Sequence, residues 1–187
     1  MIDQESARTR VVDAADALFY RRGIQAVGMD DVRTAAGISL KRLYSLFSSK
    51  DVLLVEVLTG RMAEWDEGVS AASASAVTPR DKLLAIYDFL DVWFRQDDFR
   101  GCAFINSFGE LGAVSPGVAG IARRQKLAFQ SYVADLVEQL GGSPALAAQL
   151  AILAEGAQTT AAISGRPDAA FHARAAAEAL IAGELAA

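Results

Sequence analysis

The sequence has few of the residues from which catalytic and extracellular sites are usually built. Its 187 residues include one cysteine, Cys102, and one histidine, His172. A single cysteine excludes an internal disulfide and fits a reducing cytoplasm. The sequence also has no metal-ligand cluster, no glycine-rich phosphate loop and no nucleophile elbow. These absences argue against an enzyme and against a bound cofactor or metal.

Long apolar runs are absent as well. No apolar stretch is long enough to span a membrane, and the polar first five residues do not resemble a signal peptide. Four prolines, 52% apolar residues and a mean hydropathy of +0.23 instead predict a folded chain with one or two small domains. We therefore expect a cytoplasmic protein.

Positive charge is scarce overall but concentrated at one end. The formal net charge is −5 and the isoelectric point is about 4.9. Residues 1–50 nevertheless carry eight basic and six acidic side chains, a net charge of +2, whereas the remainder carries −7. A local basic excess is the electrostatic footprint expected of a nucleic-acid contact. The acidic residues after position 50 would then lie away from the phosphate groups of the nucleic acid.

Apolar residues recur at helical spacing, and no alternating pattern of strands competes. Four prolines stand where helices can begin, and three of them follow a Ser or Thr that can act as the N-cap. The fold class is therefore predicted to be all-α with about nine helices. Six of them are expected at about 4–22, 30–36, 40–47, 49–73, 79–96 and 100–111, and three more begin at Pro116, Pro144 and Pro167.

The stretch 28–50, GMDDVRTAAGISLKRLYSLFSSK, has the pattern of a helix-turn-helix. Gly37 supplies the left-handed backbone position of the turn, and Ser39 is a good N-cap for the second helix. That second helix carries Lys41 and Arg42 in its first turn, where the helix dipole favours acidic residues. Positive side chains at a position where the dipole disfavours them indicate that they bind a negatively charged partner. The partner we predict is a DNA duplex. The alternative is that both side chains are merely solvated.

This stretch resembles the DNA-binding domain of TetR-type (TetR/AcrR) bacterial transcriptional regulators. The resemblance covers about the first third of the chain and includes an opening helix rich in Ala and Phe, then D-D-V, A-A-G-I-S, L-Y, F and S-K-D. The sequence departs from the usual pattern at several positions. Gly28 replaces a Thr or Ser, Arg33 replaces Ala, Leu46 replaces His, and Lys41-Arg42 replace Gly-Thr.

The resemblance implies a division of the chain and a function. It implies a helix-turn-helix DNA-binding domain at residues 1–48, with the motif at about 28–47, and a helical ligand-binding and dimerisation domain at 49–187. The expected function is a homodimeric transcriptional regulator, a repressor that a small-molecule ligand releases from a palindromic operator. Such a ligand would lie between the fifth and seventh helices and move the fourth.

Six residues are predicted to contact DNA. Lys41 or Arg42 can hydrogen-bond guanine O6 and N7 in the major groove. Tyr44 resembles the family's phosphate-contacting tyrosine, although it can also pack against the first helix. Lys50 stands at a helix start, where an anion is favoured, or is simply an exposed lysine. The full set is Arg33, Ser39, Lys41, Arg42, Tyr44 and Lys50.

A ligand site is predicted around the sixth helix, where Cys102, Asn106 and Glu110 recur every four positions and so share a helical face. The alternative is that the cysteine is buried and inert while the other two cap neighbouring chain. Aromatic residues can line the same pocket, or they can belong to the apolar core. The predicted ligand-binding residues are Trp65, Tyr87, Phe94, Cys102, Asn106, Glu110 and Phe129, with Trp93 and Tyr132 as further candidates for the wall.

The last two helices present faces of small residues that permit close helix packing. These faces can pack internally or form a dimer interface, and the resemblance favours a homodimer through these helices. The residues concerned are Leu146, Leu150, Leu153 and Ala157, then Ala169, Ala173, Ala176, Leu180 and Ile181. A different function also remains open, in which the chain is a small-molecule-binding or redox-sensing helical protein that uses Cys102 and binds DNA weakly or not at all.

Overall fold

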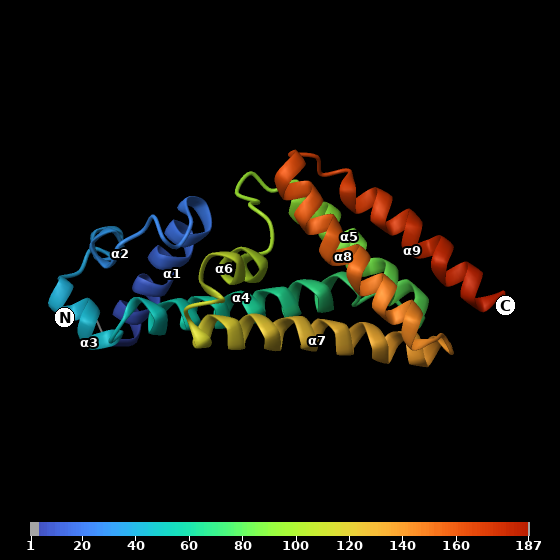
Figure 1. Ribbon diagram of the computed structural model, residues 1–187, viewed down its shortest axis with the longest axis horizontal. Helices are drawn as coiled ribbons and strands as arrows, with labels where there is room; N and C mark the ends of the chain where they lie inside the picture. The colour runs from blue at the N-terminus through green and yellow to red at the C-terminus, as the bar shows by residue number, and fades with distance from the viewer. Residues whose placement is uncertain (1–3, 187) are drawn as a thin grey trace. The chain divides into compact units, whose positions relative to one another are not determined.

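The structure, a computed structural model, describes residues 4–186 (Figure 1). Within these residues the fold is all-α, as predicted, and no helix is long and apolar enough to cross a membrane. Nine helices occur in the described part: α1 (Gln4–Arg22), α2 (Met29–Ala36), α3 (Leu40–Leu46), α4 (Lys50–Ala72), α5 (Pro79–Phe94), α6 (Ala103–Leu111), α7 (Pro116–Leu140), α8 (Pro144–Ser164) and α9 (Ala169–Leu185).

The chain forms two compact units, and two of its helices contribute residues to both. Unit 1 consists of the residues up to Ala63 together with Ala103–Arg123, and unit 2 consists of Glu64–Cys102 and the residues from Arg124 on. Helices α4 and α7 therefore each begin in unit 1 and end in unit 2. This structural division differs from the functional boundary predicted at residue 48, which stays a prediction.

Unit 1 is organised around α1, which packs against the short helix α2, and α2 in turn contacts α3. Two arginines of α1 also hold the ends of these helices. Arg10 donates to the carbonyl oxygen of Ala36 at the end of α2. Arg8 donates to the carbonyl oxygen of Leu46 at 3.3 Å and pairs with Glu56 of α4 at 2.9 Å. The orientation of α2 and α3 is therefore set by polar contacts as well as by apolar burial.

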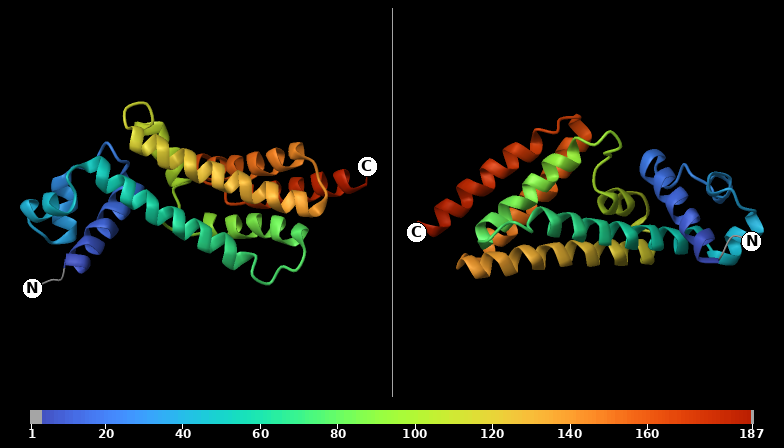
Figure 2. Two further views of the ribbon diagram at one scale, coloured as in Figure 1. Left: turned by 90° about the horizontal axis from the view of Figure 1, so that it is seen from below. Right: turned by 180° about the vertical axis from the view of Figure 1, so that it is seen from behind.

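Unit 2 contains the larger apolar core, in which α5, α8 and α9 lie side by side (Figures 1 and 2). Alanines on α8 and α9, such as Ala154, Ala170 and Ala177, are at most 1% exposed and let these helices approach closely. Tyr87 of α5 is 2% exposed, and its hydroxyl donates to the carbonyl oxygen of Leu150 at 2.8 Å. Burial raises the pKa of this phenol, which keeps it protonated and able to donate.

The helix boundaries follow local signals closely, with two exceptions. Helix α6 begins at Ala103 and not near Arg100, because Gly101 has φ +89°, a left-handed conformation that interrupts a helix. Helix α9 begins at Ala169 and not at Pro167, because the two residues before it form a turn. The other predicted proline starts are confirmed: Thr78 and Ser143 each accept a hydrogen bond from the backbone of the following turn.

Candidate nucleic-acid interface and groove

The turn between α2 and α3 is built by a glycine and a serine. Gly37 has φ +64° and ψ +41°, which residues with a Cβ rarely adopt. Its N–H and the next one donate to carbonyl oxygens in the last turn of α2, at 3.2 and 3.1 Å. Ser39 then caps α3, because its hydroxyl accepts a hydrogen bond from the N–H of Arg42 at 3.2 Å. The predicted turn chemistry is thus present.

Apolar burial decides which face of α3 points outward. Val32 and Ala36 of α2 and Leu43 and Phe47 of the following segment are at most 3% exposed. These four side chains hold one side of each helix in the core of unit 1. The residues between them in the sequence therefore face away from that core. The helix-turn-helix pattern seen in the sequence is therefore formed.

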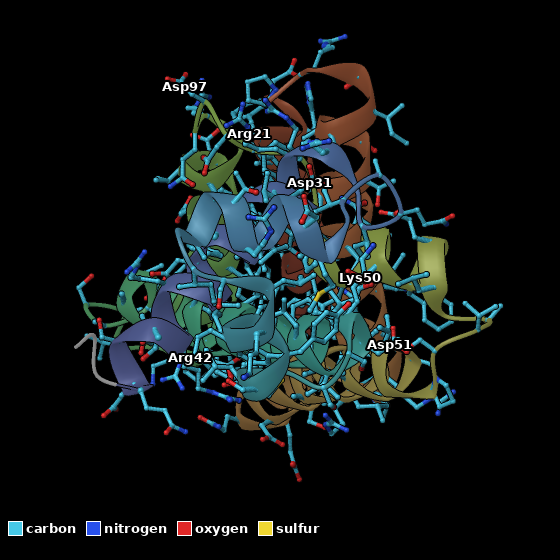
Figure 3. The ribbon with its side chains drawn as sticks, turned by 90° about the vertical axis from the view of Figure 1, so that its left-hand side faces the viewer. Arg21, Asp31, Arg42, Lys50, Asp51 and Asp97 are labelled. Carbon is cyan, nitrogen blue, oxygen red and sulfur yellow. The ribbon has the colours of Figure 1, made fainter. Side chains whose placement is uncertain are left out.

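The outward face of α3 carries two cations without partners. Lys41 and Tyr44 are exposed, the latter to 48%, and Arg42 is half-buried. Within residues 4–186, no hydrogen bond or ion pair involves the side chain of Lys41 or Arg42. Arg42 lies on α3 on the side facing the viewer in Figure 3. This face can offer two cations and a phenol to an anionic partner without breaking any contact of the protein.

Arg33 is less available than these two. Its guanidinium donates to Asp30 one turn earlier in α2, at 2.7 Å, and the side chain is 38% exposed. A surface pair of this kind contributes about 0–1 kcal/mol, so a stronger anion can displace the carboxylate. The structure therefore leaves Arg33 as a weak candidate for DNA contact, as the sequence did.

Lys50 has partners inside unit 1. It was predicted to bind phosphate at the start of α4, but its ammonium donates to the backbone carbonyl oxygen of Ile24 and lies 5.7 Å from the ring centroid of Phe19. Burial lowers the pKa of this ammonium, and the nearby Glu110 carboxylate acts in the opposite direction. Figure 3 shows Lys50 and Arg42 well apart. The contacts favour a role for Lys50 inside unit 1.

Of the predicted face of Cys102, Asn106 and Glu110, the last residue also has partners inside unit 1. The carboxylate of Glu110 accepts hydrogen bonds from the backbone N–H groups of Ile24 and Gln25, at 3.0 and 2.9 Å. Asn106 is exposed, whereas Cys102 is 5% exposed and precedes α6. The carboxylate is therefore committed to the turn after α1.

Cys102 has a neighbour that the sequence did not indicate. The ammonium of Lys126, on α7, lies 3.4 Å from its sulfur and 3.6 Å from a carboxylate oxygen of Glu155. Burial of the sulfur limits the access of other molecules to it. The residues come from three separate segments of unit 2, so spacing along the chain gave no signal of this contact.

Of the aromatic residues predicted to bind a ligand, some lie in the core of unit 2 and others line a groove on it. Tyr87 and Phe94 are buried in the core of unit 2, so these two were wrongly assigned to a ligand surface. Trp65 meets Phe129 edge to face, with ring centroids 5.5 Å apart. Both rings line a groove of about 610 Å³, to which Tyr132 also contributes. A volume of this size suits a small organic molecule.

Polar residues that the sequence did not single out complete this groove. Its charged lining residues are Asp66 of α4, Lys82 of α5 and Asp135 of α7. Within residues 4–186 none of the three forms an ion pair or a side-chain hydrogen bond. Asp66 and Asp135 are exposed residues, and partial burial of Asp66 raises the pKa of its carboxyl. The groove therefore offers aromatic faces beside two unpaired acids and one unpaired base.

The last two helices use their small-residue faces internally. Leu146, Leu150, Ala173 and Ile181 are buried in the core of unit 2, which corrects their assignment to a dimer interface. Other apolar side chains of the same helices face outward. These exposed residues are Ile152 and Ile163 on α8 and Phe171 and Leu185 on α9, each at least 52% exposed.

Comparison with known proteins places these features among regulators of transcription. The family described as "Bacterial regulatory proteins, tetR family" matches residues 11–57, which include α2 and α3. The HTH-type transcriptional activator FasR from Mycolicibacterium smegmatis is 30% identical over 150 residues, which cover 80% of this chain and 67% of that protein. The HTH-type transcriptional repressor KstR2 from Rhodococcus jostii is 32% identical over 88 residues, which cover 45% of this chain and 43% of that protein.

The fold is also similar to solved structures over nearly its whole length. A TetR-family transcriptional regulator from Streptomyces coelicolor superposes with a TM-score of 0.88 and 26% identity, and the match covers 95% of each chain. The similarity thus extends through both units, whereas the match to the family description is confined to residues 11–57.

Proposed function

From the premise that this chain belongs to the TetR family and is a DNA-binding regulator of transcription, we propose that it represses genes as a homodimer that a small molecule releases from its operator. The regulators of this family are transcription factors and not enzymes. One relative is an activator and another a repressor, and repression is the proposal made for this chain. Its place of action would be the cytoplasm, where a bacterial chromosome lies.

The observation that carries the proposal is the unpaired positive charge on α3. Lys41 and Arg42 have no partner within residues 4–186, and Tyr44 stands exposed beside them. An α-helix fits the major groove, and a Lys or Arg that reaches guanine O6 and N7 there contributes about 1–3 kcal/mol of discrimination. We assign base contact to Lys41 or Arg42, and phosphate contact to Tyr44, Ser39 and, more weakly, Arg33.

A homodimer would place two copies of α3 on one operator. In two-fold dimers of this kind the recognition helices enter major grooves about 34–36 Å apart, which explains why such operators are palindromic. The exposed apolar residues of α8 and α9 supply a candidate contact between subunits, because two copies of one apolar patch can cover each other. Ile163 and Phe171, 83% and 63% exposed, would lie at its centre.

The ligand would bind in the groove of unit 2. Trp65, Phe129 and Tyr132 supply apolar and aromatic surface, and Asp66 and Asp135 supply negative charge against the single positive charge of Lys82. Charge complementarity and the aromatic faces favour an organic cation, such as an amine attached to a ring or an alkyl chain. Such a cation would also pair with the carboxylate of Asp66.

Release would proceed through α4, which begins at Lys50 in unit 1 and ends at Ala72 in unit 2. A ligand that contacts Trp65 and Asp66 binds the second half of this helix directly. Movement of the helix would displace α3 in both subunits together. A change from 1% to 99% released protein requires that the ligand prefer the released form by about 5.5 kcal/mol.

The experiment measures the affinity of the Lys41→Ala, Arg42→Ala double variant for a duplex selected from random-sequence DNA by the wild-type protein. Affinity should fall at least 100-fold, since two contacts per subunit are lost. The slope of log affinity against log salt should also become shallower, by about 0.9 for each phosphate contact removed. Circular dichroism and the dimer mass should stay unchanged. Wild-type affinity in this variant would refute the assigned surface.

A further inference from the structure

The turn between α1 and α2 is held from two distant points of the chain. Helix α1 ends at Arg22 and α2 begins at Met29, so the intervening backbone groups have no helical partners of their own. The side chains of Ile24 and Val27 are buried, at 3% and 1% exposure, which anchors the turn in the core of unit 1. Within the turn, the carbonyl oxygen of Ile24 accepts only from the N–H of Val27, at 3.3 Å, and the N–H groups of Ile24 and Gln25 are bound by a distant part of unit 1.

A carboxylate and an ammonium satisfy these groups. Glu110, near the end of α6, accepts from the N–H groups of Ile24 and Gln25 at 3.0 and 2.9 Å. The side-chain amide of Gln25 donates in return to the carbonyl oxygen of Glu110 at 3.2 Å. Lys50, the first residue of α4, donates to the carbonyl oxygen of Ile24. We call Glu110 and Lys50, with the backbone they bind, the turn clamp.

The two charges of the turn clamp support each other. Hydrogen bonds that involve a charged group are roughly twice as strong as neutral ones. The ammonium of Lys50 is withdrawn from water onto the ring of Phe19, and the negative charge of Glu110 partly offsets that burial. Removing Glu110 would leave the N–H groups of Ile24 and Gln25 without their acceptor, and removing Lys50 would leave the carbonyl oxygen of Ile24 with the N–H of Val27 alone.

The turn clamp lies directly upstream of the recognition helices. The turn leads into Gly28, whose N–H is bound by Asp31 of α2 at 2.8 Å. Helix α2 in turn leads through Gly37 to the cap of α3 at Ser39. A shift of the turn therefore changes where α2 begins and, through it, the direction of α3. A change of about 1 Å is enough to weaken hydrogen bonds that must reach particular base edges.

We propose that Glu110 is a positioning residue for DNA binding, which acts through Lys50 and the turn after α1 and touches neither DNA nor ligand. The proposal rests on the function proposed for α3. It gives α6 a role in operator affinity in place of the ligand contact that the sequence suggested. It also explains why Lys50 points into unit 1, although its place at a helix start suits phosphate.

The test uses Glu110→Gln, Lys50→Met and the double variant in the full-length dimer. Glutamine keeps the size of the side chain but offers one acceptor oxygen for two N–H groups and carries no charge. Each single variant should bind the selected duplex about 10-fold more weakly, which corresponds to about 1.4 kcal/mol. The double variant should lose little more than either single variant, because both hold the same peptide. The salt slope should not change, because no phosphate contact is lost.

A control and a second readout separate positioning from general stability. Asp16→Asn breaks the pair with Arg61, which also joins α1 to α4 in unit 1, at 2.7 and 2.8 Å, but leaves the turn untouched. It should lower the melting temperature and keep operator affinity within about 2-fold of wild type. Hydrogen exchange at the Ile24 and Gln25 amides should become faster in Glu110→Gln and stay slow in the control.

The outcomes are distinguishable. Wild-type affinity in Glu110→Gln, with the Lys41→Ala, Arg42→Ala variant inactive, would overturn the turn clamp and leave the proposed function standing. A shallower salt slope in Lys50→Met would show that Lys50 holds phosphate, which also contradicts the turn clamp. Unchanged affinity in all these variants would instead overturn the DNA surface itself. Lys50→Met tests the same peptide independently, should Glu110→Gln fail to fold.

Discussion

Units 1 and 2 both contain charged side chains without partners in the described residues, but in different surroundings and with a different balance of sign. In unit 1, Arg8, Arg10 and Lys50 each bind carbonyl oxygens of the same unit, whereas Lys41 and Arg42 bind nothing within residues 4–186. In unit 2, Asp66 and Asp135 stand without partners in a groove walled by aromatic rings. The cations on the surface of α3 suit a polyanion such as DNA, whereas the two acidic residues that line the groove suit a small cation. We therefore propose that these unpaired charges select the partner of each unit.

The largest effect should come from the outer surface of unit 2. Ile163→Asp combined with Phe171→Asp places four charges on the apolar surface of a dimer, so the protein should become monomeric. Operator affinity should then fall more than about 100-fold, because two half-sites are no longer bound together. Light scattering after size exclusion gives the mass. Val92→Asp, at an exposed position of α5 (65%), is the matched control. A dimer that persists in the double variant would exclude this interface.

The groove provides a test of its negative charge. Benzyltrimethylammonium should quench the fluorescence of Trp65 and Trp93, the two tryptophans of the chain, more strongly than an uncharged molecule of the same shape. Asp66→Asn should weaken this binding about 10-fold, and Lys82→Met, as the control, should strengthen it. Better binding of a carboxylate of similar size would reverse the assigned ligand charge.

The pH dependence of the same binding follows from the shifted pKa of Asp66. Partial burial raises the pKa of its carboxyl above the ordinary 3.8, so the folded protein without ligand takes up this proton at a higher pH than an aspartate of ordinary pKa would. Binding of a permanent cation should be full above this pKa and should be lost as the pH falls through it. In Asp66→Asn this decline should shift toward lower pH.

The smallest effect should come from Arg33, which is a cation of unit 1 with a partner. Because Asp30 already binds its guanidinium at 2.7 Å, Arg33→Ala should change operator affinity less than about 3-fold. The same fluorescence anisotropy titration as for Lys41→Ala gives a direct comparison. A loss as large as that of Lys41→Ala would mean that pairing within the protein does not predict which cations contact DNA.

Features that depend on neighbouring residues could be predicted from the sequence. Gly37, Ser39 and the prolines at 79, 116 and 144 act within one helical turn, so their effect on helix ends is visible in the residues beside them. Pro167 misled this reasoning because a turn follows it before α9 begins. The outward position of Lys41 and Arg42 followed from helical spacing alone.

Features that depend on distant residues could not be predicted. Glu110 is 86 residues from Ile24, and its role became visible only when α6 and the turn after α1 were seen in contact. The acids of the groove lie on α4 and α7, and spacing within either helix gives no sign of the other. The small-residue faces of α8 and α9 were compatible with both core and interface, and the structure assigns them to the core.

The central claim is that the cations of α3 read bases in the major groove. Dimethyl sulfate methylates guanine N7, which lies in that groove, so protection of the selected duplex measures this contact most directly. The account predicts protected guanines in two half-sites about one helical turn apart, and loss of particular protections in Lys41→Ala or Arg42→Ala at concentrations that keep the duplex bound. Protection that is identical in wild type and in both variants would contradict it.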